Sequence, residues 1–250
     1  MTGATSAYHL RLAAGEADVQ AAQRLRYQVF VEELGGDGPL VDHARRLEID
    51  RFDAHAEHLL LTDEAQNVVG TYRFMMGEGA AQAGGFYTEG EFDLAGLKAS
   101  GLRIAELGRS CVAEGHRSGM ALYHLWHGLA RIVTERGVDI LFGTASFHGT
   151  DPDAYAPALS YLHHHHLAPM PLRARALGDG RFTLIPAEEI DRRAAMLSVP
   201  ALIKSYLRLG GTIGEGVYID HAFNTLDVLV MLNLNEMNAR QRKLYTQGMG

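Results

Sequence analysis

Cysteine is nearly absent from the sequence, in which Cys111 is the one residue of its kind. A single cysteine excludes an intrachain disulfide framework and is typical of a reducing compartment. Basic residues are the minority charge, 23 against 30 acidic residues, which gives a formal net charge of −7. Nonspecific binding to nucleic acid requires a dominant positive field, so we expect no nucleic-acid partner.

Long apolar segments are also missing. The first 20 residues contain no apolar run of the kind that forms the core of a signal peptide. A stretch of about 18 apolar residues, which a bilayer span would need, does not occur. The sequence has no internal repeat and no clear linker. We therefore expect a cytoplasmic protein, in which any membrane contact would be peripheral, at the surface of the inner membrane.

The spacing of apolar residues predicts strands and helices that alternate along the chain. Strands are expected at 8–13, 102–114, 138–147, near 182–185 and at 226–234, with a hairpin over 57–76. Helices are expected at 16–34, 120–137, 151–166 and around 200–209. The glycine-rich segments 35–39 and 78–93 are interpreted as loops. This order indicates an α/β (α+β) fold class.

Four short motifs, LRYQVFVEEL, EIDRFD, VVGTYRF and ELGRSCV, follow one another in that order. Together they resemble acyl-homoserine lactone synthases and the related ornithine–acyl-carrier-protein N-acyltransferases. The spacings of the synthases are all met, by Arg26, Phe30, Asp50, Asp53, Arg73, Glu106 and Arg109. The segments FHGTDP (147–152) and 200–231 resemble the ornithine branch specifically. The resemblance covers nearly the whole chain.

The resemblance implies a GNAT-like mixed, mostly antiparallel central sheet flanked by helices. It implies one acyltransferase domain over 1–250, with a C-terminal extension over about 167–250 packed on it. The implied reaction moves a 3-hydroxyacyl group from acyl-carrier protein to the α-amine of ornithine and gives lyso-ornithine lipid. The co-substrate is then a phosphopantetheine thioester, and neither a metal nor a bound organic cofactor is implied. Expected substrate contacts are Arg26, Phe30, Asp50, Asp53, Arg73, His148 and Asp151.

Two departures from the resemblance bear on the product and on the acyl donor. Lactone synthases typically carry a tryptophan shortly after Phe30, where this chain has VEELGG, which argues against a lactone product. CoA-dependent GNAT enzymes have a glycine-spaced loop before the long helix, whose N–H groups close around pyrophosphate. Here GHRSGMALYH is out of register, which favours a carrier protein over CoA. Expected donor contacts are Val112, Arg117, Ser118 and Gly119.

Amide formation from a thioester needs a base, because an α-amine is mostly protonated at neutral pH. Glu106 is our candidate, and Arg109 would orient it or hold the carboxylate of the amino acid. Residues three apart on a regular strand face opposite sides, so a shared site requires a bulge near Gly108. That bulge would free the backbone N–H near Ser110 as an oxyanion donor.

Several alternatives remain open at this stage. Glu106 and Arg109 could form a purely structural ion pair. Cys111 has no adjacent activating group and is interpreted as core filling rather than as an acyl-accepting nucleophile. The HHHH run at 163–166 spreads around its helix and is interpreted as a solvated helix end rather than a metal site. His148 and Asp151 would contact substrate or cap the helix that follows them.

The acidic residues Asp50 and Asp53 also have two alternative roles. Either one would bind the positive end of the amino-acid acceptor, or it would pair with an arginine to close a lid. At the level of function, the alternatives are an acyl-CoA-dependent GNAT and an N-acyltransferase for lysine, glutamine or glycine. A third is a non-catalytic, membrane-active protein, because the segment 201–211 is amphipathic and basic.

Overall fold

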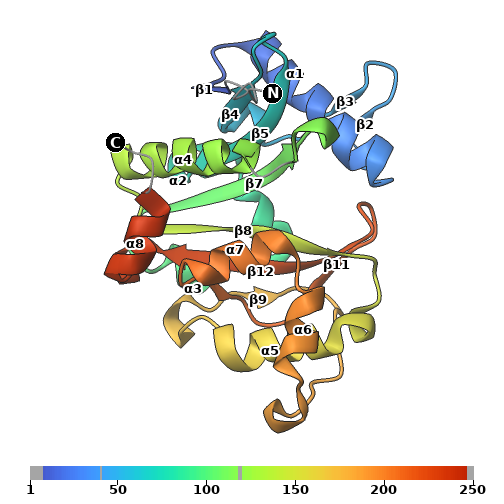
Figure 1. Cartoon of the computed structure of the whole chain (residues 1–250), viewed down its shortest axis with the longest axis vertical. Coiled ribbons are helices and arrows are strands. Elements are labelled where there is room, and N and C mark those ends of the chain that lie inside the picture. Colours follow the sequence, from blue (N-terminus) through green and yellow to red (C-terminus); the bar gives the residue numbers. More distant parts are fainter. Residues whose placement is uncertain (1–7, 40, 118–119, 247–250) are drawn as a thin grey trace, which may run out of the picture. The chain divides into compact units, whose positions relative to one another are not determined.

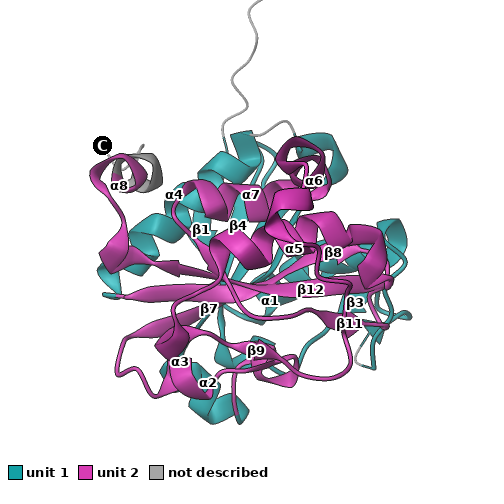
Figure 2. Cartoon of the chain, turned by 90° about the horizontal axis from the view of Figure 1, so that it is seen from below, with its two compact units in different colours: residues 1–84, 107–137, 245–250 teal, residues 85–106, 138–244 magenta. Residues whose placement is uncertain are grey.

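The structure is a computed structural model that describes residues 8–39, 41–117 and 120–246, without the side chains of 243–246. Figure 1 follows the chain, and Figure 2 shows its two compact units. Unit 1 comprises residues 1–84, 107–137 and 245–250, and unit 2 comprises residues 85–106 and 138–244. No helix in the described part of the chain is long and apolar enough to span a membrane.

The sheet of unit 1 is formed by β1 (His9–Leu12), β4 (Glu57–Thr62), β5 (Val68–Met76) and the second part of β7 (Ile104–Val112), in that order. The pairs β1–β4 and β4–β5 are antiparallel. On β5, a Cβ on Gly70 would lie 3.0 Å from Leu125 of α4 (Met120–Glu135). Arg73, three residues on, faces the opposite side, where it meets Asp53. Arg26 at the end of α1 (Glu16–Arg26) contacts the same aspartate, so α1 and α4 cover opposite faces.

Smaller elements of unit 1 frame the region around Asp53. A π-helical turn, Tyr27–Glu33, continues directly from α1, and the hairpin of β2 (Val41–Asp42) and β3 (Leu47–Glu48) follows. Next come a 3-10 turn, Asp53–His55, and, after β5, helix α2 (Gly77–Ala83). A second 3-10 turn, Glu114–His116, lies between β7 and α4.

Unit 2 continues from the first residues of β7, which pair in parallel with β8 (Ile140–His148). The central strand β12 (Thr225–Asn233) pairs antiparallel with β8, β10 (Thr212–Ile213) and β11 (Tyr218–Asp220). Residues 226–232 are all buried, as expected of an apolar run covered on both faces. Figure 2 shows α5 (Ala156–His166) and α7 (Ala201–Arg208) on one face, and α3 (Ala95–Lys98) and β9 (Arg175–Ala176) on the other.

The remaining elements of unit 2 are short. The strand β6 (Phe92–Asp93) pairs with β9, and a 3-10 turn, Tyr87–Gly90, precedes it. The other 3-10 turns are Pro152–Tyr155, Met170–Leu172, Ala187–Glu189 and Leu234–Glu236. Helices α6 (Arg192–Ser198) and α8 (Ala239–Thr246) complete the described chain, the last residues of α8 being counted with unit 1.

The predicted fold class, a mostly antiparallel sheet flanked by helices, is confirmed. Two local predictions are wrong. The segment 78–93 is not a loop, because it contains most of α2, the Tyr87–Gly90 turn and β6. The segment 182–185 is not a strand: the N–H groups of Thr183 and Ile185 donate to the side chains of Asp153 and Ser160. The proposed domain boundaries stay a prediction.

Gly79 of α2 packs against the backbone that follows Asp53. A Cβ at this position would lie 2.2 Å from the carbonyl oxygen of His55, whereas a Cβ on Gly77 of the same helix would meet nothing within 4 Å. We predict that Gly79→Ala lowers the free energy of unfolding by about 1–3 kcal/mol through overpacking. Gly77→Ala is the matched control and should be neutral or slightly stabilising. Urea unfolding of both variants checks this, and equal stabilities would contradict the contact.

Candidate active site

A cluster of buried charges joins five of the predicted residues in unit 1. Three arginines meet three acidic side chains there, so formal charges balance. The members of this charge cluster are Arg26, Glu48, Asp50, Asp53, Arg73 and Arg109. Glu48, the first residue of the EIDRFD motif, is the member that the sequence analysis did not select.

Arg26 and Asp53 form the centre of the charge cluster. The guanidinium of Arg26 donates to both carboxylate oxygens of Asp53, at 2.8 and 2.7 Å, and its Nε lies 2.5 Å from Glu48. Asp53 also accepts from Gln23 at 2.9 Å and pairs with Arg73 at 3.2 Å. Arg26 is 0% exposed. A buried guanidinium of this kind requires paired acceptors, and the two-pronged Arg–carboxylate geometry supplies them.

The pKa values within the cluster follow from this pairing. Burial alone would raise the pKa of Asp53, but the hydrogen bond and charge of Arg26, with Arg73 and Gln23, lower it well below its usual value. Burial would likewise raise the pKa of Asp50, but the charges of Arg73 and Arg109 lower it below its usual value. Both carboxylates are therefore ionised at neutral pH. This geometry favours the arginine-pairing role for them, while contact with the acceptor stays a prediction.

Arg109 joins the cluster from the middle of β7. Its Nη2 lies 3.0 Å from Asp50 and its Nε lies 3.2 Å from Glu48. Its backbone has a φ of 51°, in the left-handed region that non-glycine residues rarely adopt. The sequence analysis predicted a bulge near Gly108, and the structure has a residue of positive φ one position later. The shift of strand pairing that a bulge would produce stays a prediction, as does the use of the Ser110 N–H.

Glu106 lies in the part of β7 that belongs to unit 2, where it pairs with Phe142 of β8. Glu106 is 3% exposed. The Oε1 atom accepts from the backbone N–H of Thr88 at 2.7 Å and from its hydroxyl at 2.5 Å. The Oε2 atom accepts from the N–H of Tyr87 at 3.1 Å. The Tyr87–Gly90 turn, which the sequence analysis treated as loop, thus holds the candidate base. The joint role of Glu106 and Arg109 stays a prediction.

The predicted donor contacts are described in part. Arg117 donates from Nε to the carbonyl oxygen of Val112 at 2.9 Å and forms an ion pair with Glu33. These contacts fix the loop after β7 to the end of the π-helical turn. Ser118 and Gly119 lie outside the described residues. A role for any of the four in binding the acyl donor remains to be tested.

Asp151 and His148 precede α5. The sequence analysis left open whether they contact substrate or cap that helix. The carboxylate of Asp151 accepts from the N–H of Asp153 at 3.1 Å, which caps the 3-10 turn before the helix. The carbonyl oxygen of His148 accepts from Tyr155 at 2.8 Å. Capping therefore accounts for Asp151, and substrate contact stays a prediction for both. In the histidine run at the end of α5, His164 Nε2 lies 2.8 Å from the carbonyl oxygen of Ile185.

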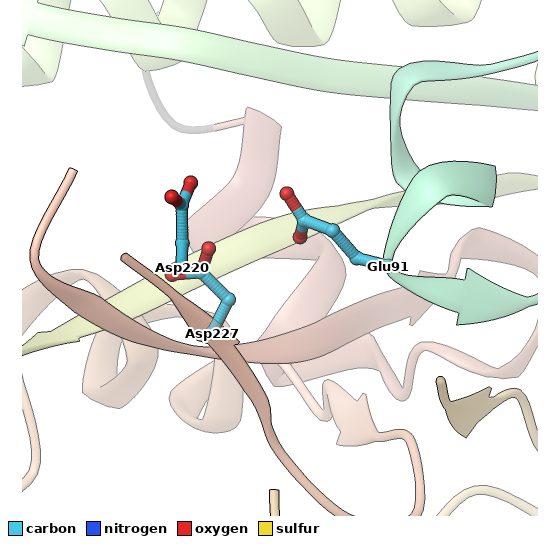
Figure 3. Close-up of side chains that lie close together, drawn as sticks. All are labelled: Glu91, Asp220 and Asp227. Carbon is cyan, nitrogen blue, oxygen red and sulfur yellow. The ribbon is translucent and has the colours of Figure 1, made fainter. Parts of the chain in front are cut away.

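Unit 2 contains a group of three carboxylates that the sequence analysis did not find. Glu91, Asp220 and Asp227 each bring one carboxylate oxygen within 4.8 Å of those of the other two, and Figure 3 shows the three side chains close together. Burial raises the pKa of the adjacent Tyr218, and the three carboxylates raise it further. Such oxygens suit a hard cation, but acidic groups also gather without one, so no role is assigned. The available signal was Asp227, a lone charge within an apolar strand.

The charge cluster makes stability depend on Asp53. We predict that Asp53→Asn lowers the free energy of unfolding by about 3–5 kcal/mol at pH 7, because buried arginines then lack a negatively charged partner. The stabilisation by a carboxylate of lowered pKa is complete above its unfolded pKa and is lost as the pH falls. The difference between wild type and variant should therefore shrink below about pH 4 in urea unfolding.

Asp37→Asn is the matched control, since the Asp37 side chain is 72% exposed and pairs with His43 at the surface, and it should change stability little. A variant Asp53→Asn of wild-type stability, with only a raised KM for the amino acid, would instead support direct contact with the acceptor.

Comparison with solved structures supports the fold. Residues 25–127 match the family described as Acetyltransferase (GNAT) domain. FeeM, an N-acyl amino acid synthase from uncultured soil microbes, has a TM-score of 0.57 at 15% identity and covers 98% of this chain and 100% of its own. The CoA-dependent acyl-homoserine lactone synthase BjaI, with SAM and isopentyl-CoA, has a TM-score of 0.55 at 13% identity, over 97% and 88%. At these identities the likeness shows the fold alone.

Curated relatives extend the match to sequence. The L-ornithine N(alpha)-acyltransferase of Rhodobacter capsulatus is 49% identical over 253 residues, covering 99% of this chain and 98% of that protein. The enzymes of the same name from Brucella abortus and Agrobacterium fabrum are each 41% identical, over 97% and 94% of this chain and 90% and 84% of theirs. The chain is thus an N-acyltransferase, and it belongs to the family of L-ornithine N(alpha)-acyltransferases.

Proposed function

We propose that this chain acylates the α-amine of L-ornithine with a 3-hydroxyacyl group taken from acyl-carrier protein, which gives lyso-ornithine lipid. The observation that carries the choice of acceptor is the full-length identity of 49% to an L-ornithine N(alpha)-acyltransferase. The family membership sets aside the non-catalytic alternative. The amphipathic segment 201–211 has another explanation, because Ile203 and Tyr206 of α7 are buried and the helix packs on β12.

Carrier protein is the proposed donor because the glycine-spaced loop before α4 is out of register for a pyrophosphate. A carrier-bound phosphopantetheine has one phosphate and no nucleotide, so it makes less use of such a loop. The BjaI enzyme, whose fold is similar, is a CoA-dependent synthase, so the fold alone does not select the donor. Acyl-CoA is therefore the alternative that the assay must include.

In the proposed mechanism, Glu106 accepts a proton from the ammonium of ornithine, directly or through a water molecule. The neutral amine attacks the thioester carbonyl, and the carbonyl oxygen becomes an oxyanion that the Ser110 N–H would stabilise. Collapse of this intermediate breaks the C–S bond and forms the amide. The released thiolate takes up the second proton of the nitrogen, and Glu106 passes the first proton to water. The hydrogen bonds from Thr88 and Tyr87 support this role, because they hold the buried carboxylate in one orientation.

The charge cluster contributes through Arg109. Asp50 and Glu48 fix its guanidinium, which is 15% exposed at the side chain, while Arg26 and Arg73 are almost fully buried. Arg109 is thus the arginine of the cluster best placed to reach a solute, and we assign it to the carboxylate of the amino acid. The remaining members would keep that guanidinium in place.

The assay combines purified chain, single amino acids and either an acyl-carrier thioester or acyl-CoA, with mass spectrometry of the products. We expect N-acyl-ornithine from the carrier thioester, and less product from acyl-CoA or from lysine, glutamine and glycine. Glu106→Gln should lower kcat by roughly 100- to 10,000-fold, the range typical of a general base. Glu78→Gln, the same change at an exposed glutamate of α2, is the control. Undiminished activity of Glu106→Gln would rule out the base.

Direct attack on the thioester, without an acyl-enzyme, agrees with the surroundings of Cys111. This residue is 6% exposed and packs with Leu25 and Val29, and Phe30 lies against the same group. Burial raises the pKa of its thiol to about 12, so the nucleophilic thiolate is scarce at neutral pH.

We therefore predict that Cys111→Ala retains kcat within about twofold and loses only about 1 kcal/mol of stability through the small cavity it leaves. Intact-mass measurement of wild type after incubation with acyl donor alone should show no acyl adduct. A stable adduct that disappears in Cys111→Ala would establish an acyl-cysteine intermediate in place of direct attack.

A further inference from the structure

Thr88 stands out because its hydrogen-bonding groups converge on one carboxylate oxygen. Both its N–H and its hydroxyl donate to Oε1 of Glu106, at 2.7 and 2.5 Å. The residue is 0% exposed. A buried hydroxyl must find a partner, and valine would fill the same volume without this requirement. The hydroxyl is therefore not needed for packing, and its contact with Glu106 calls for another explanation.

The turn that carries Thr88 is held against β8, the strand that pairs with β7 at Glu106. Phe86, directly before the turn, is buried, and its ring meets Phe142 edge-on at a centroid distance of 5.0 Å. Phe142 is also the residue that pairs with Glu106 across β7 and β8. Glu89 accepts from the N–H of Phe86 at 3.1 Å and pairs with Lys98 of α3. The hydroxyl of Thr88 thus reaches Glu106 from a turn that is packed on β8 and paired with α3.

We propose that Thr88 is a positioning residue, whose hydroxyl holds the carboxylate of Glu106 in the orientation that accepts the proton of the amine. The inference rests on the proposed function of Glu106 as the base. A free glutamate side chain has several rotamers, and ordering it in one of them has an entropic cost. Donors to both carboxylate oxygens, of which Thr88 supplies its N–H and its hydroxyl, select one of these rotamers before substrate binds.

Two variants separate the hydroxyl from the shape of the residue. Thr88→Val keeps the volume and removes the hydroxyl, and Thr88→Ser keeps the hydroxyl and removes a methyl group. We expect Thr88→Val to lower kcat about 10- to 100-fold, the effect of losing a hydrogen bond to a charged group, with KM for both substrates within about threefold. Thr88→Ser should restore kcat to within about threefold of wild type. If the valine variant unfolds, Thr88→Ala against Thr88→Ser makes the same comparison.

A double-mutant cycle tests whether Thr88 acts through Glu106. In the background of Glu106→Gln, Thr88→Val should lower the residual kcat by less than about twofold, because the group that it positions is already gone. If Thr88→Val has the kcat of wild type, or if the losses in the cycle are additive, the inference about Thr88 is wrong. In either case a low kcat of Glu106→Gln would still support Glu106 as the base. Full activity of Glu106→Gln would instead show that the proposed base is wrong, and the role of Thr88 with it.

Discussion

A fully buried guanidinium, that of Arg26, imposes the main constraint on unit 1. Transfer of such a charge from water is unfavourable unless acidic groups surround it in good geometry. Glu48 at the end of β3 and Asp53 in the segment between β3 and β4 meet that demand. Arg73 from β5 and Arg109 from β7 then balance the remaining negative charge. The end of α1, the connection before β4 and two strands are thereby tied to one set of ion pairs.

The strand β7 is where this constraint meets the proposed chemistry. Its first part supplies Glu106 to unit 2, and its second part supplies Arg109 to unit 1. The left-handed backbone at Arg109 is a conformation that a residue with a Cβ adopts only when its surroundings enforce it. The ion pairs of Arg109 with Glu48 and Asp50 are the contacts that stabilise this backbone conformation. A local backbone irregularity is thus coupled to the electrostatics of the charge cluster.

Much of this arrangement could be predicted from the sequence, because the informative features are periodic or closely spaced. The apolar stripe of α4 and the apolar run of β12 predicted their elements, and the motifs contain the residues that the structure brings together in the charge cluster. What the sequence could not provide is contact between distant segments. Thr88 and Glu91 lie in a glycine-rich stretch whose short elements have no apolar period, and Glu48 becomes significant only when Arg26 is brought against it. The segment 182–185 has strand-like residues, yet its backbone found side-chain partners instead.

The close approach of Gly79 to the carbonyl oxygen of His55 has a consequence for how variation in this family should be interpreted. Position 79 carries no charge, and α2 holds no member of the charge cluster. Its lack of a side chain nevertheless sets how near α2 can come to the turn that begins with Asp53. Among relatives, residue size at this position should therefore co-vary with the turn at 53–55. A glycine that would be expected to weaken the helix is thus the residue that allows α2 to pack directly against the backbone of this turn.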